Sequence, residues 1–160
     1  MTIPILSTEV STHAVGVDLI ELDRIAHVLA RHPLRFLSRV YTPLEVAFCR
    51  GRIPELAARF AAKEAVMKAL GTGVRSVGWR DIEVLPDRRG KPLVYLHGRA
   101  VKRAERIGLE AIDISLTHLR EQAMAVVVCR QLHQDQNHEA ARAHLILRLR
   151  ERGLIDESVT

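Results

Sequence analysis

Alternating apolar and polar positions near the N-terminus predict a β-strand over residues 13–22, "HAVGVDLIEL". Successive side chains of a strand point to opposite faces, so this stretch divides into two sets. The branched residues Val15, Val17 and Leu19 fall on one face, and Ala14, Gly16 and Asp18 fall on the other. A carboxylate among such small neighbours needs a cation, hydrogen-bond donors or a cleft. Residues 1–12 lack a pattern and are expected to form a loose lead-in.

Apolar residues three and four positions apart predict a first helix that begins near residue 22 and stops before Pro33. Its inward side consists of Leu22, Ile25, Val28 and Leu29. The opposite side carries Arg24 and Arg31, one heptad apart, and is expected to be exposed and basic.

A second helix is predicted to begin at "TPLE", residues 42–45, and to end near Gly51. Thr42 is expected to act as the N-cap, with Pro43 in the first helical position. Glu45 would reach back to the N-cap and complete a capping box.

In the second half of the chain, the spacing of the apolar residues changes from a helical period to alternation with polar residues. "DIEVL" and "PLVYLHG" flank "PDRRGK", a short polar run that predicts a hairpin turn. A short helix, "RAVKRAERIG", then leads to two further strands, "AIDISLTH" and "QAMAVVVCR". From residue 131 a polar linker precedes a basic helix with Leu145, Ile146 and Leu149 on one side. The chain is therefore divided into the lead-in, a main domain over 13–130 and a tail over 131–160, which either caps the body or binds a partner.

Composition supports one folded domain. The chain has 160 residues, 48% hydrophobic and 27% charged, which is enough apolar side chain for a core. No apolar run approaches the roughly 18 residues that a membrane span needs, and no leader pattern opens the chain, so a cytoplasmic location is expected. Cys49 and Cys129 lack metal-binding or disulfide-type spacing and are expected to be buried free thiols.

The net charge of +5 favours an anionic partner, either nucleic acid, an acidic protein or a phosphorylated small molecule. The arginines are spread along the chain and only 4% of residues are aromatic, so stacking platforms for nucleic acid are hard to find. A nucleic-acid-binding module therefore remains as an alternative of second rank.

The sequence "RFAAKEAVMKALGTG", residues 59–73, predicts a helix that starts near residue 54 and ends where Gly71 can adopt a left-handed conformation. At 100° per residue its small residues form one stripe that can lie close against a sheet. This stripe consists of Ala58, Ala61, Ala62, Ala65 and Ala69. Glu64 and Lys68 lie beside it, a spacing that by itself is typical of a surface ion pair. The apolar character around the helix instead indicates burial and charges that need partners.

Neighbouring features favour a phosphate ligand at this helix. Arg59 and Lys63 add positive charge one turn from Glu64, and the glycines of "GTG", Gly71 and Gly73, leave backbone N–H groups accessible. Asp18 and Glu64, from separate elements, are suitable ligands for Mg²⁺, which takes one or two protein oxygens and completes its shell with water and substrate phosphate.

Four motifs, in chain order, resemble those of the holo-acyl-carrier-protein synthases, the short bacterial 4'-phosphopantetheinyl transferases. They are "GVDLIELDRI", "RFAAKEAVMKALGTG", "DIEVLPDRRGKPLVYLHG" and "DISLTHLREQAMAVVV". The resemblance implies an α+β fold in which a mainly antiparallel sheet packs with a long central helix. It also implies transfer of 4'-phosphopantetheine from the co-substrate coenzyme A to a serine of apo acyl carrier protein in fatty acid biosynthesis, leaving adenosine 3',5'-bisphosphate.

The resemblance implies roles for several side chains. Asp18 and Glu64 match the family's Mg²⁺ ligands, and Lys63 and Lys68 match its phosphate-contacting lysines. His118, which by position alone is typical of a turn residue at a strand end, matches a histidine near the phosphate end of the nucleotide. Chemically, Mg²⁺ and Lys68 would neutralise phosphate oxygens, while either Glu64 or a metal-bound water would accept the serine proton. The expected catalytic set is therefore Asp18, Glu64 and Lys68.

The resemblance further implies a homotrimer with active sites between subunits, and contact between Arg24 and the acidic helix of the carrier protein. Arg31, on the same basic side, is expected to take part in that contact. Leu119 stands where the family usually has a small polar residue, and the tail after residue 130 has no counterpart in the minimal family. A scaffold that binds coenzyme A without transfer remains an alternative function.

Overall fold

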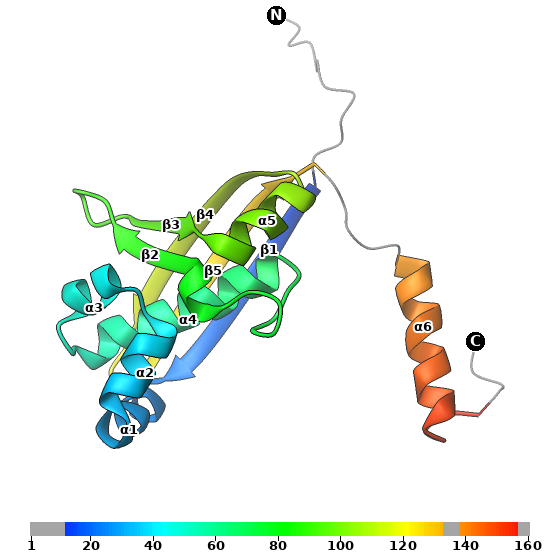
Figure 1. Ribbon diagram of the computed structural model, residues 1–160, viewed down its shortest axis with the longest axis horizontal. Coiled ribbons are helices and arrows are strands. Elements are labelled where there is room, and N and C mark those ends of the chain that lie inside the picture. The colour runs from blue at the N-terminus through cyan, green and yellow to red at the C-terminus, as the bar shows by residue number, and fades with distance from the viewer. Residues whose placement is uncertain (1–11, 133–137, 157–160) are drawn as a thin grey trace, which may run out of the picture.

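The structure is a computed structural model that describes residues 12–132 and 138–156. Its main sheet is antiparallel and has the strand order β1–β5–β4, with β1 at Thr12–Glu21, β5 at Gln122–Gln131 and β4 at Leu109–His118 (Figure 1). A hairpin of β2 (Ile82–Pro86) and β3 (Pro92–Leu96) lies beside β4. The predicted strands and hairpin are thus confirmed. Thr12, assigned to the lead-in, is the first residue of β1, and residues 1–11 lie outside the described chain.

The helices are α1 (Leu22–Arg31), α2 (Pro33–Val40), α3 (Pro43–Cys49), α4 (Ile53–Ala69), α5 (Gly98–Arg106) and α6 (His138–Glu151), with a short 3₁₀ helix at Trp79–Asp81. The α+β class with a long central helix is therefore confirmed. Helix α2 was not predicted, because Pro33 was taken only as a stop signal. In the structure Pro33 occupies the first turn of α2, where its missing N–H is harmless.

Helix α1 faces the core as predicted at Leu22 and Ile25, but the prediction that Val28 points inward is wrong. The side chain of Val28 is 38% exposed, since it lies at the edge of the apolar arc of the helix. Arg24 and Arg31 are exposed, in agreement with the predicted basic side.

Helix α3 begins with the predicted capping box. The Oγ1 atom of Thr42 accepts a hydrogen bond from the backbone N–H of Glu45, whose carboxylate accepts one from the N–H of Thr42 at 2.8 Å. Pro43 is in the first helical position, and Arg50 ends the helix in a left-handed conformation. Cys49, the last residue of the helix, and Cys129 on β5 are buried free thiols, as expected.

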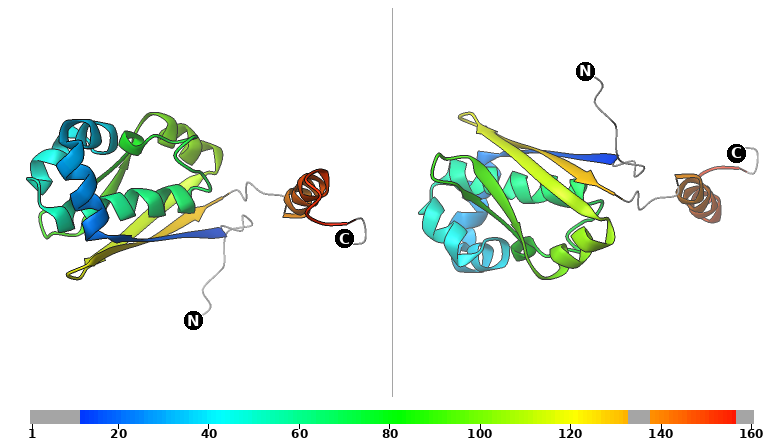
Figure 2. Two further views of the ribbon diagram at one scale, coloured as in Figure 1. Left: turned by 90° about the horizontal axis from the view of Figure 1, so that it is seen from below. Right: turned by 90° about the horizontal axis from the view of Figure 1, so that it is seen from above.

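Helix α4 lies across one face of the main sheet, over β1 and β5 (Figure 2). The predicted alanine stripe is buried in this contact. At Gly16 the two backbones touch, because a Cβ atom at this position would lie 1.9 Å from the carbonyl oxygen of Ala65. Only glycine allows an approach this close. The contact holds the end of β1 that carries Asp18 against the middle of α4.

The opposite face of the main sheet carries three pairs of apolar residues in direct register. Val15 is opposite Val128, Val17 is opposite Val126, and Leu19 is opposite Met124. Val15 is 63% exposed and Leu19 is 57% exposed, and no described helix covers this face (Figure 2). We refer to these six residues as the open sheet face. The predicted division of β1 into two sets is confirmed, and its branched set is the one that faces solvent.

The predicted tail helix is confirmed as α6, which stands apart from the body in the views of Figures 1 and 2. Leu145 and Leu147 are exposed on its surface. The division of the chain at residue 131 and the function of the tail remain predictions. Within the described ranges, no helix combines the length and apolarity that crossing a membrane requires.

The contact at Gly16 predicts a large effect of a single methyl group. Gly16→Ala is expected to lower the free energy of unfolding by about 3 kcal/mol or more, because β1 or α4 must shift to relieve the clash. Urea unfolding followed by circular dichroism measures this. Gly73→Ala is the matched control, since a Cβ atom there meets nothing within 4 Å. Equal losses in the two variants would contradict the assignment.

Candidate functional site

Asp18 and Glu64 come together where β1 crosses α4. The Nζ atom of Lys68, one turn after Glu64, donates a hydrogen bond to Asp18 Oδ1 at 3.0 Å and another to the carbonyl oxygen of Val17 at 2.8 Å. The side chain of Asp18 is largely covered, whereas that of Lys68 is half exposed. The cluster of Asp18, Glu64 and Lys68, here called the carboxylate cleft, is therefore reachable from solvent.

The electrostatics of the carboxylate cleft favour a bound cation. Burial raises the pKa of Glu64 above its usual range, and repulsion from the Asp18 carboxylate raises it further. The positive charges of Lys68 and Arg24 act in the opposite direction without reversing the shift. A further positive charge beside the two carboxylates would therefore relieve an existing repulsion.

The donor set suits Mg²⁺ in particular. Carboxylate oxygens are the hard ligands that this ion prefers, and it commonly takes only one or two of them from the protein. Among the described residues, no group of three histidine, cysteine or acidic side chains is placed to enclose an ion. A cation held by Asp18 and Glu64 would therefore keep several positions for water or for phosphate oxygens.

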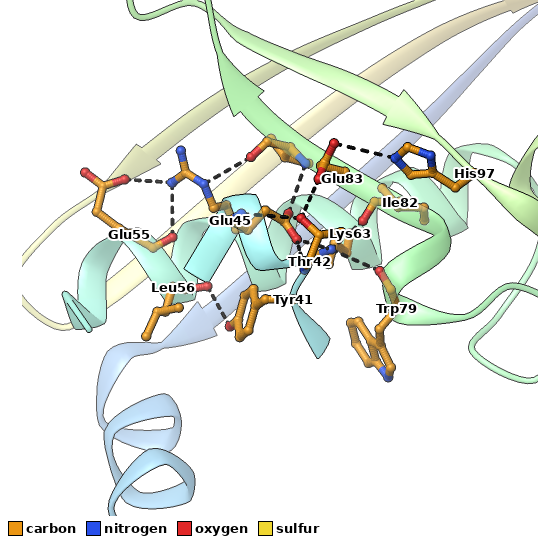
Figure 3. Close-up of polar contacts among 12 residues, drawn as sticks. Tyr41, Thr42, Glu45, Glu55, Leu56, Lys63, Trp79, Ile82, Glu83 and His97 are labelled. Atoms are coloured by element: carbon orange, nitrogen blue, oxygen red, sulfur yellow. Dashed lines mark hydrogen bonds and ion pairs between the residues drawn. The ribbon is translucent and has the colours of Figure 1, made fainter. Parts of the chain in front are cut away.

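Lys63 does not reach the carboxylate cleft, although the sequence favoured a phosphate contact for it. Its side chain is fully buried and its Nζ atom lies 2.8 Å from Glu45 Oε2 (Figure 3). The same nitrogen donates hydrogen bonds to the carbonyl oxygens of Trp79, at 3.0 Å, and Ile82. Because these acceptors and the ion pair engage the ammonium in the core, the structure corrects the expected phosphate contact of Lys63.

Glu45 is the centre of this buried polar cluster. One of its oxygens caps α3 and pairs with Lys63, and the other accepts a hydrogen bond from the N–H of Val84 on β2 at 2.9 Å. Burial lowers the pKa of Lys63, while the Glu45 carboxylate counteracts that shift. The cluster joins α3, α4 and β2, and it is a structural element beside the cleft.

His118 lies at the end of β4 and lines a cavity of about 450 Å³ on the other flank of α4. The cavity also contains Phe48, Glu55, Arg59, Arg88 and Thr117. The guanidinium of Arg59 is held in place by the Glu55 carboxylate at 2.7 Å and by the carbonyl oxygen of Val84 at 3.1 Å. Arg88 was not predicted as a site residue, because its place in the hairpin turn "PDRRGK" does not indicate a neighbouring cavity.

Asp18 and His118 do not share a cleft within one chain. Their strands, β1 and β4, lie on either side of β5 and are therefore about 10 Å apart. At 100° per residue, the α4 residues of the His118 cavity lie on the side of the helix away from Glu64. One chain thus presents the carboxylate cleft and the His118 cavity as two separate places, with α4 between them.

Gly71 ends α4 with a left-handed conformation, as predicted, and lines a further cavity beside α5. Gly73 is not among the residues that line it, and its carbonyl oxygen accepts hydrogen bonds from the N–H groups of Ser76 and Val77. The expected binding function of both glycines remains a prediction.

Arg24 and Arg31 lie on the exposed side of α1. The charge of Arg24 acts on the pKa of Glu64, so this side of the helix borders the carboxylate cleft. A partner that covers the basic side of α1 would therefore also approach Asp18 and Glu64.

Comparisons with known proteins agree on one family. The family model described as the 4'-phosphopantetheinyl transferase superfamily matches residues 14–127. The holo-[acyl-carrier-protein] synthase of Herpetosiphon aurantiacus is 48% identical over 120 residues, which cover 71% of this chain and 94% of that protein. The synthase of Moorella thermoacetica is 48% identical over 116 residues, which cover 71% of this chain and 90% of that protein.

Solved structures give the same result. The crystal structure of Helicobacter pylori holo-[acyl-carrier-protein] synthase in complex with coenzyme A has a TM-score of 0.67 and 28% identity, and the match covers 72% of this chain and 98% of that one. The ACPS-CoA complex of Chronobacterium ammoniagenes has a TM-score of 0.67 and 34% identity. The match covers 75% of this chain and 98% of that one. The resemblance drawn from the four motifs is confirmed.

The buried position of Lys63 predicts a structural function for it. Lys63→Met leaves the Glu45 carboxylate without its ion-pair partner in the core and is expected to cost about 3–5 kcal/mol of unfolding free energy. Lys68→Met, which removes a half-exposed ammonium, is expected to cost less than about 1 kcal/mol. Urea unfolding of both variants gives the comparison. A Lys63→Met protein as stable as the parent would show that the buried ion pair contributes little.

Proposed function

The chain belongs to the 4'-phosphopantetheinyl transferase superfamily, and from this premise we propose that it is a holo-[acyl-carrier-protein] synthase. The enzyme transfers 4'-phosphopantetheine from coenzyme A to a serine of apo acyl carrier protein and releases adenosine 3',5'-bisphosphate. Asp18, Glu64 and Lys68 come together where β1 crosses α4, and this observation supports the assignment of the activity to these residues.

Asp18 and Glu64 would hold Mg²⁺, which when bound neutralises phosphate oxygens of coenzyme A. Lys68 fixes the Asp18 carboxylate through its hydrogen bond and adds a positive charge at the same place. In the transfer, the serine oxygen bonds to the phosphorus that bears pantetheine. The bond from that phosphorus to its bridging oxygen breaks, and the oxygen remains on the nucleotide.

The serine must also lose its proton, and Glu64 is the side chain in the cleft suited to accept it, directly or through a water molecule. A carboxylate can act as a general base of this kind, and a metal-bound water is the alternative acceptor.

The cavity around His118 suits the nucleotide end of coenzyme A. It offers a fixed guanidinium from Arg59, a second from Arg88 and the imidazole of His118. Phosphate groups are well matched by arginine donors.

We propose that the carboxylate cleft and the His118 cavity are two half-sites of one active site in a homotrimer, in which the cleft of one subunit faces the cavity of the next. The open sheet face supports this assembly, because a contiguous apolar surface of this kind is typical of a protein interface. The position of α4 between the half-sites gives a second reason, since one chain cannot bring them together.

The basic side of α1, with Arg24 and Arg31, is the surface proposed for the acyl carrier protein. Its position beside the cleft would deliver the acceptor serine to Asp18 and Glu64, and its charge suits an acidic partner. The expected cytoplasmic location is part of the same proposal.

The transfer assay tests the proposed metal ligands. The protein is incubated with coenzyme A, Mg²⁺ and apo carrier protein, and the carrier is weighed by mass spectrometry. Asp18→Asn and Glu64→Gln are each expected to lower kcat/KM by about 100-fold or more, because each removes a charge that holds the cation. Glu105→Gln on the exposed side of α5 is the control for loss of a carboxylate and should keep the parent rate. Undiminished transfer by both cleft variants would refute the assignment.

Mixing two variants, each impaired in a different half-site, tests the proposal that the sites lie between subunits. Asp18→Asn impairs the carboxylate cleft, and His118→Ala impairs the nucleotide half-site. If subunits reassort at random, about one site in four combines two intact halves, because each half is intact with a probability of about one half. Co-refolded mixtures should therefore recover about a quarter of the parent transfer rate. A mixture that is no more active than its components would contradict the proposal, because it would show that each active site takes both halves from the same subunit.

A further inference from the structure

Four cations of α5 line the cavity that Gly71 borders, at the C-terminal end of α4. The cavity has a volume of about 400 Å³. Arg99, Lys102, Arg103 and Arg106 are three and four positions apart, so they lie on one side of the helix. The facing wall consists of Gly71, Thr72, Ser76 and Val77. The cavity therefore combines four positive charges with two hydroxyl groups.

Two of the guanidinium groups are held in place by the protein. Arg103 Nε donates a hydrogen bond to the carbonyl oxygen of Leu70, at the end of α4, at 2.7 Å. Arg99 Nε lies 3.1 Å from Asp81 Oδ2. Gly71 permits the position of Arg103, because a Cβ atom at residue 71 would lie 3.1 Å from Nη2 of that arginine. The cationic wall is thus anchored at two points.

The charge of this wall is only partly balanced. Asp81 neutralises Arg99, but the side chains of Lys102 and Arg106 form no ion pair or hydrogen bond with any residue that the structure describes. Like charges at three- and four-residue spacing destabilise a helix. An anion in the cavity would remove that repulsion.

We propose that this cavity, the α5 site, binds the phosphate group of a small molecule. Arginine donors match phosphate oxygens in pairs, and the hydroxyl of Ser76 supplies a further donor, whereas that of Thr72 already donates to the carbonyl oxygen of Met67. The volume of about 400 Å³ suits a small molecule. The α5 site is distinct from the His118 cavity, and Gly71 places it about one turn beyond Lys68 along α4.

The phosphate has two chemical sources, coenzyme A itself or a separate phosphorylated metabolite. In either case the ligand reaches the end of α4 next to the carboxylate cleft. The α5 site is a binding site in addition to those of the proposed function. Binding there does not require the transfer reaction to occur.

The test is a titration of the full chain with inorganic pyrophosphate in the absence of Mg²⁺, followed by the backbone amide NMR signals of Thr72, Ser76 and Arg103. Saturable shifts are expected. Lys102→Gln/Arg106→Gln should weaken this binding at least about tenfold, because it removes two charged contacts. Arg89→Gln/Arg148→Gln, which removes the same charge from exposed positions elsewhere, should bind like the parent.

Absence of shifts at these three amides, or equal weakening in both double variants, would overturn the α5 site. Repeating the titration with saturating coenzyme A identifies the source. If coenzyme A shifts the same amides and blocks pyrophosphate, it supplies the phosphate itself, and if pyrophosphate still titrates, the ligand is a separate molecule. Because the readout is binding, a failed transfer assay would leave this result unaffected.

Discussion

The geometry of the candidate site depends on the backbone contact between Gly16 of β1 and Ala65 of α4. Asp18 follows Gly16 by two residues on the same face of its strand, and Glu64 immediately precedes Ala65. A larger side chain at position 16 would separate the two elements and with them the two carboxylates. The absence of a side chain at one position therefore fixes the distance between functional groups that lie 46 positions apart in the sequence.

The charged side chains of helix α4 lie in different environments, because they point in different directions around the helix axis. Lys68 reaches the carboxylate cleft, Lys63 enters the core and pairs with Glu45, and Arg59 lines the cavity of His118. Each cation has an acidic partner, so a helix with four charged side chains in ten residues can be almost wholly buried. The helix is both the centre of the core and the wall between the carboxylate cleft and the His118 cavity.

The sequence predicted most of this fold because its local signals are strong. The strand alternation, the capping box at Thr42 and the glycine at the end of α4 all depend on near neighbours. The proximity of Asp18 and Glu64 was predicted from the suitability of two carboxylates as Mg²⁺ ligands, together with the family resemblance. The position of Lys63 could not be predicted in this way, because its partner Glu45 was already explained by the capping box. Helix α2 was missed because proline both ends one helix and begins the next.

The strand order of the main sheet has a consequence for how the chain folds. β5 lies between β1 and β4, yet it is the last strand of the sheet to be synthesised. Glu21 pairs with Gln122 and Thr12 with Gln131, so every contact between these strands closes a loop of more than 100 residues. Non-local pairings of this kind slow folding, since chain entropy is lost before contacts compensate for it. On the ribosome, β1 must remain without its neighbour until almost the whole body has been translated, and that interval is when the nascent chain most needs protection from aggregation.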